Sequence, residues 1–300
     1  MTNILVTGGA GLIGSEFTEV NKTTRREFDL SDSEQVRLMY EKYKPEYIIH
    51  TAAKVGGVLA NTRYPAEFYR DNILINTNVI DYAQKYNVKK LCYFSSTCVF
   101  PDQIDYPLTE DKIHLGAPHR SNFGYAYAKR MAGIQIDAYN QQYGTDYFEV
   151  IPTNVYGPND NYNLESGHVI PSLIHRCYLA IKNNTDIVVW GSGEPLREFV
   201  FARDVATISS LLLTKDQVGS VIVSSSAEIS IKDLVTVICD KMKFKNNIIF
   251  DADKPDGQYR KNTDTSKLKK LLGDVTFTSL DQGLDETIEY FLSNYASIRK

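Results

Sequence analysis

The sequence contains few cysteines and no long apolar run, and these shortages exclude several classes of protein. Its four cysteines (Cys92, Cys98, Cys177 and Cys239) are scattered and form no Cys-x-x-Cys pair, so we expect neither a disulfide framework nor a bound metal. No apolar stretch approaches the roughly 20 residues that span a bilayer. The first residues also lack the basic and apolar segments of a signal peptide, which predicts a cytoplasmic protein.

An excess of positive charge is also missing. The chain has 33 Lys and Arg against 37 Asp and Glu, a formal net charge of −4, whereas nucleic-acid-binding proteins usually carry a basic surface. A small anionic ligand is still compatible with this balance, because it needs only a few local arginines. With 300 residues, 43% hydrophobic and 23% charged, the composition is that of an ordinary globular protein of one or two domains.

Short β-branched segments alternate with longer stretches of helical periodicity. Strands are predicted at residues 3–7, 47–50, 91–95, 147–151 and 187–190, and helices at about 66–86, 125–143, 169–182 and 231–242. The segment Ser31–Glu34 reads as a capping box in front of a further helix. This alternation predicts an α/β fold with a Rossmann-type, doubly wound parallel sheet.

A polar stretch at residues 158–163 predicts a domain boundary. We expect a cofactor-binding domain over residues 1–160 and a smaller α/β substrate-binding domain over 161–300. Residues 197–213 are expected to be able to pack back onto the first domain.

Three glycines spaced three apart follow the first predicted strand. Gly8, Gly11 and Gly14 lack Cβ atoms, so the backbone can turn tightly and approach a pyrophosphate, whose charge would meet the start of a helix. Leu12 and Ile13 belong to the same expected site. The alternative is a glycine-rich turn that binds no ligand, but the position directly after a strand favours a dinucleotide.

Two arginines and an aspartate follow where a second strand would end. Arg25 and Arg26 are placed to meet a 2′-phosphate, which favours NADP over NAD, and Asp29 to reach the adenine amino group. Two solvated surface arginines are the alternative. Only 14 residues separate Gly14 from Asp29, which is short for a helix, a turn and a strand. The sequence leaves open whether the first helix is truncated or the second strand is vestigial.

Tyr125 and Lys129 are spaced to lie on one face of a helix, one turn apart. An ammonium near a phenol lowers the phenol's pKa from about 10 and makes it a usable acid at neutral pH. Ser96 ends a preceding strand and would lie beside the same crevice. With the glycine loop, this pattern resembles the extended short-chain dehydrogenase/reductase superfamily.

That resemblance implies roles for these residues. Ser96 and Tyr125 would hydrogen-bond a substrate carbonyl, and Lys129 would hold the nicotinamide ribose. Asn154 and Tyr156 would lie against the nicotinamide. The other residues that it implies for the cofactor site are Ala52, Ala53, Pro152 and Val155.

Two further residues depend on their surroundings for an interpretation. Taken alone, Cys98 is equally well a small buried hydrophobe, and His168 a helix cap or a solvated side chain. Several sequence segments, however, follow one another in a characteristic order: His50–Gly57, Ser96–Pro101, Pro152–Asn161, Gly167–Pro171, Trp190–Gly193, Arg197–Phe199 and Lys254–Gly257. With them the chain resembles, nearly end to end, the GDP-L-fucose synthase family of NADP-dependent 3,5-epimerase/4-reductases.

The family resemblance implies a function and the residues that perform it. The expected reaction converts GDP-4-keto-6-deoxy-D-mannose to GDP-L-fucose with NADP(H), Cys98 acting as the base and His168 as the acid of the epimerisation. A thiol and an imidazole have ordinary pKa values of about 8.5 and 6.5, close enough to neutral to exchange protons. The substrate-binding residues implied are Asn154, His168, Arg176, Trp190, Arg197 and Asp256.

Other interpretations stay open at this stage. Arg197 fits a surface ion pair as well as a diphosphate contact. The whole chain fits an epimerase/reductase for another nucleotide 4-keto-sugar, or a catalytically silent NADP-binding protein on the same fold. Homodimers are usual in the superfamily, so a homodimer is expected.

Overall fold

A six-stranded parallel sheet forms the centre of the first part of the molecule. The computed structural model describes residues 3–216, 218–253 and 258–300. The strands are β1 (Ile4–Thr7), β2 (Asn21–Thr23), β3 (Tyr47–His50), β4 (Lys90–Phe94), β5 (Asp146–Pro152) and β9 (Ser220–Val223). Their order is β2-β1-β3-β4-β5-β9, and each neighbouring pair is parallel. The predicted Rossmann-type, doubly wound fold is therefore confirmed.

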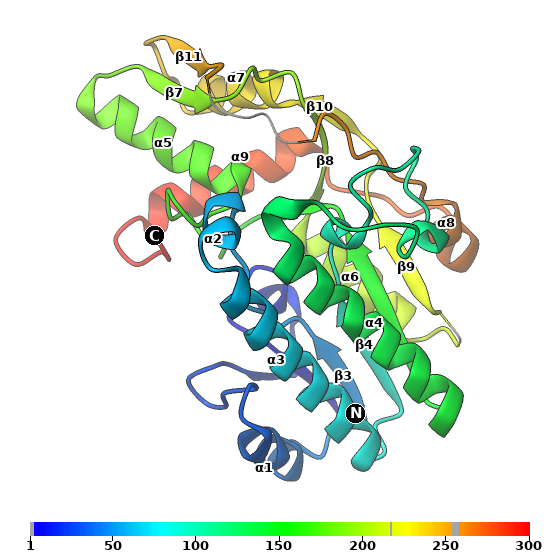
Figure 1. Ribbon diagram of the computed structural model, residues 1–300. Coiled ribbons are helices and arrows are strands. Elements are labelled where there is room, and N and C mark those ends of the chain that lie inside the picture. Colours follow the sequence, from blue (N-terminus) through cyan, green and yellow to red (C-terminus); the bar gives the residue numbers. More distant parts are fainter. Residues whose placement is uncertain (1–2, 217, 254–257) are drawn as a thin grey trace.

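Helices cover both faces of this sheet because neighbouring strand residues point to opposite sides (Figure 1). Leu5 and Ile48 face α1 (Ser33–Tyr43), α3 (Pro65–Lys85) and α4 (Phe123–Tyr143). Val6 and Ile49 face α6 (Ala202–Leu212) and α8 (Ser266–Leu272) on the other side. The bounds of α3 and α4 agree closely with the helices predicted at 66–86 and 125–143.

The start of α1 differs from the prediction. Its N-cap is Asp32, whose side chain accepts hydrogen bonds from the backbone N–H groups of Glu34 and Gln35. Ser31, the predicted cap, instead donates its hydroxyl to the carboxylate of Asp29 at 2.7 Å. The capping box at Ser31–Glu34 was therefore a wrong prediction, because Asp29 competes for the serine.

The second part of the molecule contains two small sheets and three helices around their own core. One sheet has the order β10 (Glu228–Ser230), β8 (Leu196–Phe201), β6 (Asn154–Tyr156), and β11 (Ile248–Asp251) pairs with β7 (Ile187–Trp190) in the other. The helices α5 (Val169–Asn183), α7 (Ile231–Lys241) and α9 (Leu280–Asn294) bury Ile174, Leu234 and Phe291 between them. No helix in the described ranges is long and apolar enough to cross a membrane.

The chain returns to the first core after building part of the second. Val200 of β8 and the buried face of α6 pack on the six-stranded sheet, and β9 pairs with β5 at its edge. Figure 1 shows β9 and α6 with the six-stranded sheet, far from the other late elements α7 and β11. The first core therefore includes residues well beyond the polar stretch at 158–163.

The short segment after Gly14 is explained by a missing helix. Only a 3₁₀ turn, η1 (Gly14–Glu16), stands where a first helix would begin, whereas β2 keeps its parallel pairing with β1. Lys22 occupies part of the vacated space: a Cβ on Gly9 would lie 2.6 Å from its Cβ. Its ammonium donates to the Ser15 carbonyl at 2.8 Å, and Phe17 is buried in the core. The first helix is therefore truncated, and the second strand is retained.

Candidate functional site

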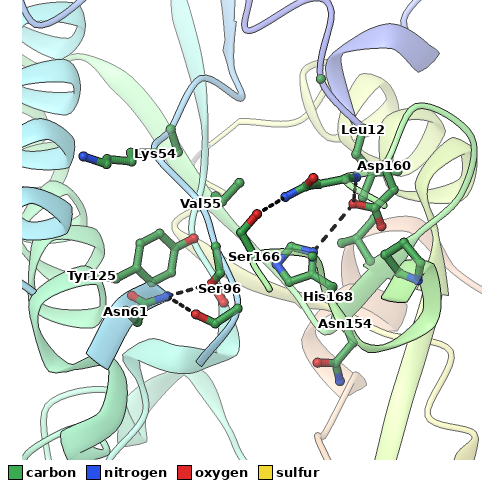
Figure 2. A pocket seen from close by; sticks show the side chains of 18 of the residues that line it. Leu12, Lys54, Val55, Asn61, Ser96, Tyr125, Asn154, Asp160, Ser166 and His168 are labelled. Atoms are coloured by element: carbon green, nitrogen blue, oxygen red, sulfur yellow. Dashed lines mark hydrogen bonds and ion pairs between the residues drawn. The ribbon is translucent and has the colours of Figure 1, made fainter. Parts of the chain in front are cut away.

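One large cleft, of about 1900 Å³, lies over the carboxyl ends of the parallel strands. The loops after β1, β3, β4 and β5 form one side, and residues from β6, α5, β7 and β8 form the other. This edge, where neighbouring connections leave in opposite directions, is where doubly wound sheets bind ligands. In Figure 2, Tyr125 approaches from one side and His168 from the other.

The glycine loop has the tight turn that its spacing predicts. Gly8 has φ +73°, and a Cβ on Gly8 would lie 2.8 Å from the backbone of Ala52. A Cβ on Gly14 would lie 2.3 Å from the Gly8 carbonyl oxygen, so Gly14 supports the loop from beneath and does not line the cleft. Gly8, Gly11, Leu12 and Ile13 line it.

The cleft fits an extended dinucleotide. From the glycine loop it runs past Arg25, Arg26 and Asp29 at one end, and over Ala52 and Ala53 to Ser96 and Tyr125. Pro152, Asn154 and Val155 also border it. This continuous path joins a backbone that admits no side chain at Gly8, two cations and a pair of hydroxyl groups.

The arginine end of the path is open to solvent. The side chain of Arg25 is 81% exposed, and its guanidinium lies 3.3 Å from the Asp29 carboxylate. Hydrogen bonds from Ser31 and the charge of Arg25 lower the pKa of Asp29, although partial burial opposes them. The carboxylate is thus held in place beside a cation that remains accessible to a phosphate.

The predicted trio lies together, but Lys129 is deeper than expected. Tyr125 lines the cleft with Ser96, whereas Lys129 is 2% exposed and lies behind the wall. Its ammonium donates to the Phe94 carbonyl at 2.7 Å and lies 5.8 Å from the ring centroid of Tyr125. Burial lowers the pKa of Lys129 to about 7, against the opposing effect of the Glu149 carboxylate.

The prediction that Lys129 lowers the pKa of Tyr125 is wrong for this structure. Burial raises the pKa of Tyr125 well above its usual value, the Cys98 sulfur adds to the increase, and a hydrogen bond with Ser96 partly offsets it. The Lys129 ammonium, 5.8 Å from the ring centroid of Tyr125, does not offset the effect of burial. Tyr125 is therefore a fully protonated hydrogen-bond donor at neutral pH.

Cys98 and His168 both border the cleft. Cys98 is half-buried, unlike the three other cysteines, which are buried, and its N–H donates to the Ser96 hydroxyl at 3.3 Å. His168 occupies the N-cap position of α5, yet its side chain makes no cap hydrogen bond and is 47% exposed. Its Nδ1 lies 3.7 Å from Asp160 Oδ1. Burial lowers the pKa of His168, but the Asp160 carboxylate outweighs burial, and the net shift is upward.

The far side of the cleft carries cations and an exposed aromatic ring. Arg176, Trp190 and Arg197 all line it. The Arg176 guanidinium lies 5.6 Å from the Trp190 ring centroid, and Arg197 donates to the carbonyls of Leu196 and Gln258 at 2.7 Å. These contacts orient both guanidinium groups. Asp256, the remaining predicted substrate contact, lies outside the described residues.

Two residues that the sequence did not point to also lie at the site. Lys261 and Asp160 line the cleft, and neither belongs to a periodic pattern that the sequence reveals. Burial lowers the pKa of Lys261, while the Cys98 sulfur and Asp102 favour its charged form. Tyr156 was predicted to lie against the nicotinamide. It borders the cleft, but its ring is only 2% exposed and packs 5.5 Å from the ring of Phe201 in the second core.

Comparisons with known proteins agree with this geometry. Residues 4–223 match the model of the NAD dependent epimerase/dehydratase family. The chain is 45% identical to the GDP-L-fucose synthase of Dictyostelium discoideum, over 99% of this chain and 97% of that protein. It is 35% identical to the GDP-L-fucose synthase of Escherichia coli, over 99% and 98% of the two chains.

A solved structure gives the same result. The crystal structure of a GDP-L-fucose synthetase from Naegleria fowleri bound to NADP superposes with a TM-score of 0.91 and 40% sequence identity, covering 100% of this chain and 95% of the other. The chain therefore belongs to the NAD dependent epimerase/dehydratase family and, within it, to the GDP-L-fucose synthases.

Proposed function

We propose that this protein converts GDP-4-keto-6-deoxy-D-mannose to GDP-L-fucose. The reaction inverts C3 and C5 and then reduces the 4-keto group with NADPH. The observation that carries the proposal is that Ser96, Cys98, Tyr125 and His168 border one cleft, which continues to the glycine loop and the arginine pair. The relatives named GDP-L-fucose synthase and the NADP-bound structure support the substrate and the cofactor.

The hydroxyl groups of Ser96 and Tyr125 form the carbonyl site. Both donate to the C4 oxygen of the substrate, and they hold it more strongly when it becomes an enolate or an alkoxide. Because the pKa of Tyr125 is raised by burial, the phenol keeps its proton until the oxygen carries negative charge. One pair of donors therefore serves both the epimerisations and the reduction.

Cys98 and His168 exchange the protons of the carbons next to the ketone. The keto group makes the C–H bonds at C3 and C5 acidic, and inversion needs a base on one face and an acid on the other. Cys98, as thiolate, takes the proton, and the electron pair moves into the enolate. His168, as imidazolium, then returns a proton to the opposite face, which its raised pKa favours by keeping it protonated.

The cofactor residues would hold NADP(H) beside the carbonyl site. NADPH, when bound, supplies the hydride to C4. Gly8, Gly11, Leu12 and Ile13 receive the pyrophosphate, and Arg25 and Arg26 the 2′-phosphate. Tyr125 gives its proton to the C4 oxygen. Lys129 is assigned to the nicotinamide ribose, which requires its ammonium to turn from the Phe94 carbonyl toward the cleft. Asp29, Ala52, Ala53, Pro152, Asn154 and Val155 complete the cofactor-binding set.

The opposite end of the cleft binds the GDP part of the substrate. Arg176 and Arg197 contact the diphosphate or the sugar, and Trp190 borders the nucleotide. Asn154 contributes to the substrate site as well. Lys261 adds a third cation. Burial lowers its pKa, and a bound diphosphate would stabilise its charged form.

We also propose a homodimer in the cytosol. Ile134 and Tyr143 on α4 and Tyr69 on α3 are 45%, 49% and 45% exposed, which supports an interface through these two helices. Light scattering should give twice the chain mass, and Ile134→Glu should reduce it to one chain. Cell fractionation tests the location.

Isotope incorporation tests the reaction. The protein is incubated with GDP-4-keto-6-deoxy-D-mannose and NADPH in deuterated water, and the product is analysed by NMR. We expect NADPH oxidation and deuterium at both C3 and C5. Turnover without deuterium would contradict the epimerase half, and the absence of any turnover would contradict the whole proposal. A parallel assay with the corresponding uridine-linked substrate tests the alternative of another nucleotide.

A further inference from the structure

Asp160 is a buried carboxylate beside the proposed acid. It lies in the loop between β6 and α5, is 4% exposed, and places Oδ1 at 3.7 Å from Nδ1 of His168 (Figure 2). Oδ1 also accepts a hydrogen bond from the Asn161 N–H at 2.7 Å. Within the described ranges, Oδ2 is buried and has no hydrogen-bond partner. Burying a carboxylate so incompletely satisfied is costly, which indicates a role beyond packing.

The loop that follows Asp160 brings it to His168. Asn161 donates its side-chain amide to the Ser166 hydroxyl at 3.1 Å, and the Asn163 carbonyl accepts from the Gly167 N–H at 2.9 Å. A Cβ on Gly167 would lie 2.4 Å from the Asn161 carbonyl oxygen, so the loop closes tightly just before the histidine. The two side chains therefore meet across a folded loop with many internal hydrogen bonds.

A helix-capping role does not account for the carboxylate. The residue at the N-cap of α5 is His168 itself, and no side chain caps that position. Asp160 Oδ2, which would be free to accept from the first turn of the helix, accepts no hydrogen bond from any described residue. Among the described residues, the His168 ring is the titratable side chain with which Asp160 pairs.

We infer that Asp160 is a positioning residue for His168. Its carboxylate holds the Nδ1–H side of the ring, which leaves Nε2 directed to the substrate as the proton donor. The negative charge stabilises the imidazolium before proton transfer, and Nδ1 keeps its own proton while the Nε2 proton moves to carbon. The inference rests on the proposed function, because it concerns the acid of that reaction.

Several other charged or titratable groups surround His168. Arg299 in the C-terminal segment disfavours the imidazolium, and burial does so more strongly. Arg176 lies two turns further along α5, and Cys98 and Tyr125 border the same cleft. Asp160 is thus the group that favours the protonated ring.

The test compares Asp160→Asn with Glu165→Gln. Both remove one negative charge from the same loop, but Glu165 is exposed and does not border the cleft. The histidine titrations are followed by NMR, with His168→Gln identifying the resonance. We expect the pKa of His168 to be lower in Asp160→Asn and unchanged in Glu165→Gln. An unchanged titration in folded Asp160→Asn overturns the inference, whatever the activity.

Kinetics give a second measurement. For solvent deuterium incorporation, Asp160→Asn should lower kcat about 10- to 100-fold with little change in KM. This loss is smaller than the roughly 10²–10⁴-fold that an acid catalyst contributes, because His168 itself remains. The descending limb of its pH profile should move to lower pH. The reverse oxidation of GDP-L-fucose by NADP⁺, which needs no epimerisation, should stay near the wild-type rate. Equal losses in both reactions would contradict a role through His168.

A measurement on the wild-type protein covers the case in which Asp160→Asn does not fold. The ¹⁵N shifts of neutral His168 report which ring nitrogen carries the proton. We expect the Nδ1–H tautomer, and the Nε2–H tautomer would overturn the inference. Because this spectrum requires no turnover, its outcome is independent of whether GDP-4-keto-6-deoxy-D-mannose is the substrate.

Discussion

The two sides of the cleft are built differently. On the first side, formed by the loops after β1, β3, β4 and β5, the functional groups lie next to the core of the six-stranded sheet, and Lys129 is 2% exposed. On the second side they stand on a helix end and on the short strand β7, and the side chains of His168 and Trp190 remain about half exposed, at 47% each.

This difference determines how each side controls protons. Burial dominates on the first side, where it raises the pKa of Tyr125 and lowers that of Lys129. A single partner dominates on the second side, where Asp160 raises the pKa of His168 against burial. The first side therefore suits a fixed oxygen atom, and the second suits groups that must reach several positions of a sugar.

The largest effect is expected from removing the phenol on the first side. Tyr125→Phe should slow the reduction by about 10²–10⁴-fold, because the C4 oxygen loses its proton donor. Deuterium incorporation should fall less, since Ser96, Cys98 and His168 remain. Tyr127→Phe, a half-buried tyrosine on the same helix, is the matched control. Equal rates for the two variants, measured by NADPH oxidation, would show that Tyr125 is not the donor.

The proposed base should separate the two half-reactions. Cys98→Ala should lower deuterium incorporation at C3 and C5 by about 100-fold, because the proposed base is removed. The oxidation of GDP-L-fucose by NADP⁺ should continue, as the carbonyl site is intact. Product formed from GDP-4-keto-6-deoxy-D-mannose at the normal rate would make the thiol merely structural.

Substitutions among the cations of the second side should affect binding more than chemistry. Arg176→Leu and Arg197→Leu should each raise the KM for the nucleotide sugar about 10- to 100-fold, since a hydrogen bond to a charged group contributes about 1.5–3 kcal/mol. The control is Arg203→Leu, which removes a surface arginine paired with Glu286 outside the cleft. A loss of kcat at unchanged KM would place these arginines in the chemistry instead.

The sequence predicted the first side better than the second. The helices α3 and α4 carry long periodic patterns in the sequence. The glycine loop and the Tyr125–Lys129 pair are local motifs. The return of β9 to the edge of the first sheet depends on pairing with β5, far away in the sequence, which no local pattern encodes. Asp160 meets His168 only after its loop has folded, so their spacing alone did not reveal the pair.

Burial was the other quantity that the sequence did not supply. The spacing of Tyr125 and Lys129 placed them on one face correctly, yet the direction of the pKa shift at Tyr125 depended on how deeply both groups lie. The start of α1 was also missed, because Asp29 accepts the Ser31 hydroxyl and Asp32 takes the N-cap position instead. Such competition is decided by three-dimensional placement.

The smallest predicted effect concerns the stability cost of the buried lysine. The pKa of Lys129 is about 7 in the folded protein against its usual 10.5, so above pH 7 the folded state loses this proton while the unfolded state keeps it. The free energy of unfolding should therefore rise with pH between about 7 and 10.5, and this gain is lost again as the pH falls from 10.5 to about 7.

Lys129→Met removes that titration while keeping the length of the side chain. Thermal or urea unfolding should show the variant to be more stable than wild type by about 1–3 kcal/mol at about pH 6, and by less at about pH 9. Lys182→Met, at an exposed position on α5, should differ from wild type equally at both pH values. A Lys129→Met difference that does not depend on pH would mean that the sheet accommodates the ammonium without cost, and the contrast between the two sides of the cleft would then rest on Tyr125 alone.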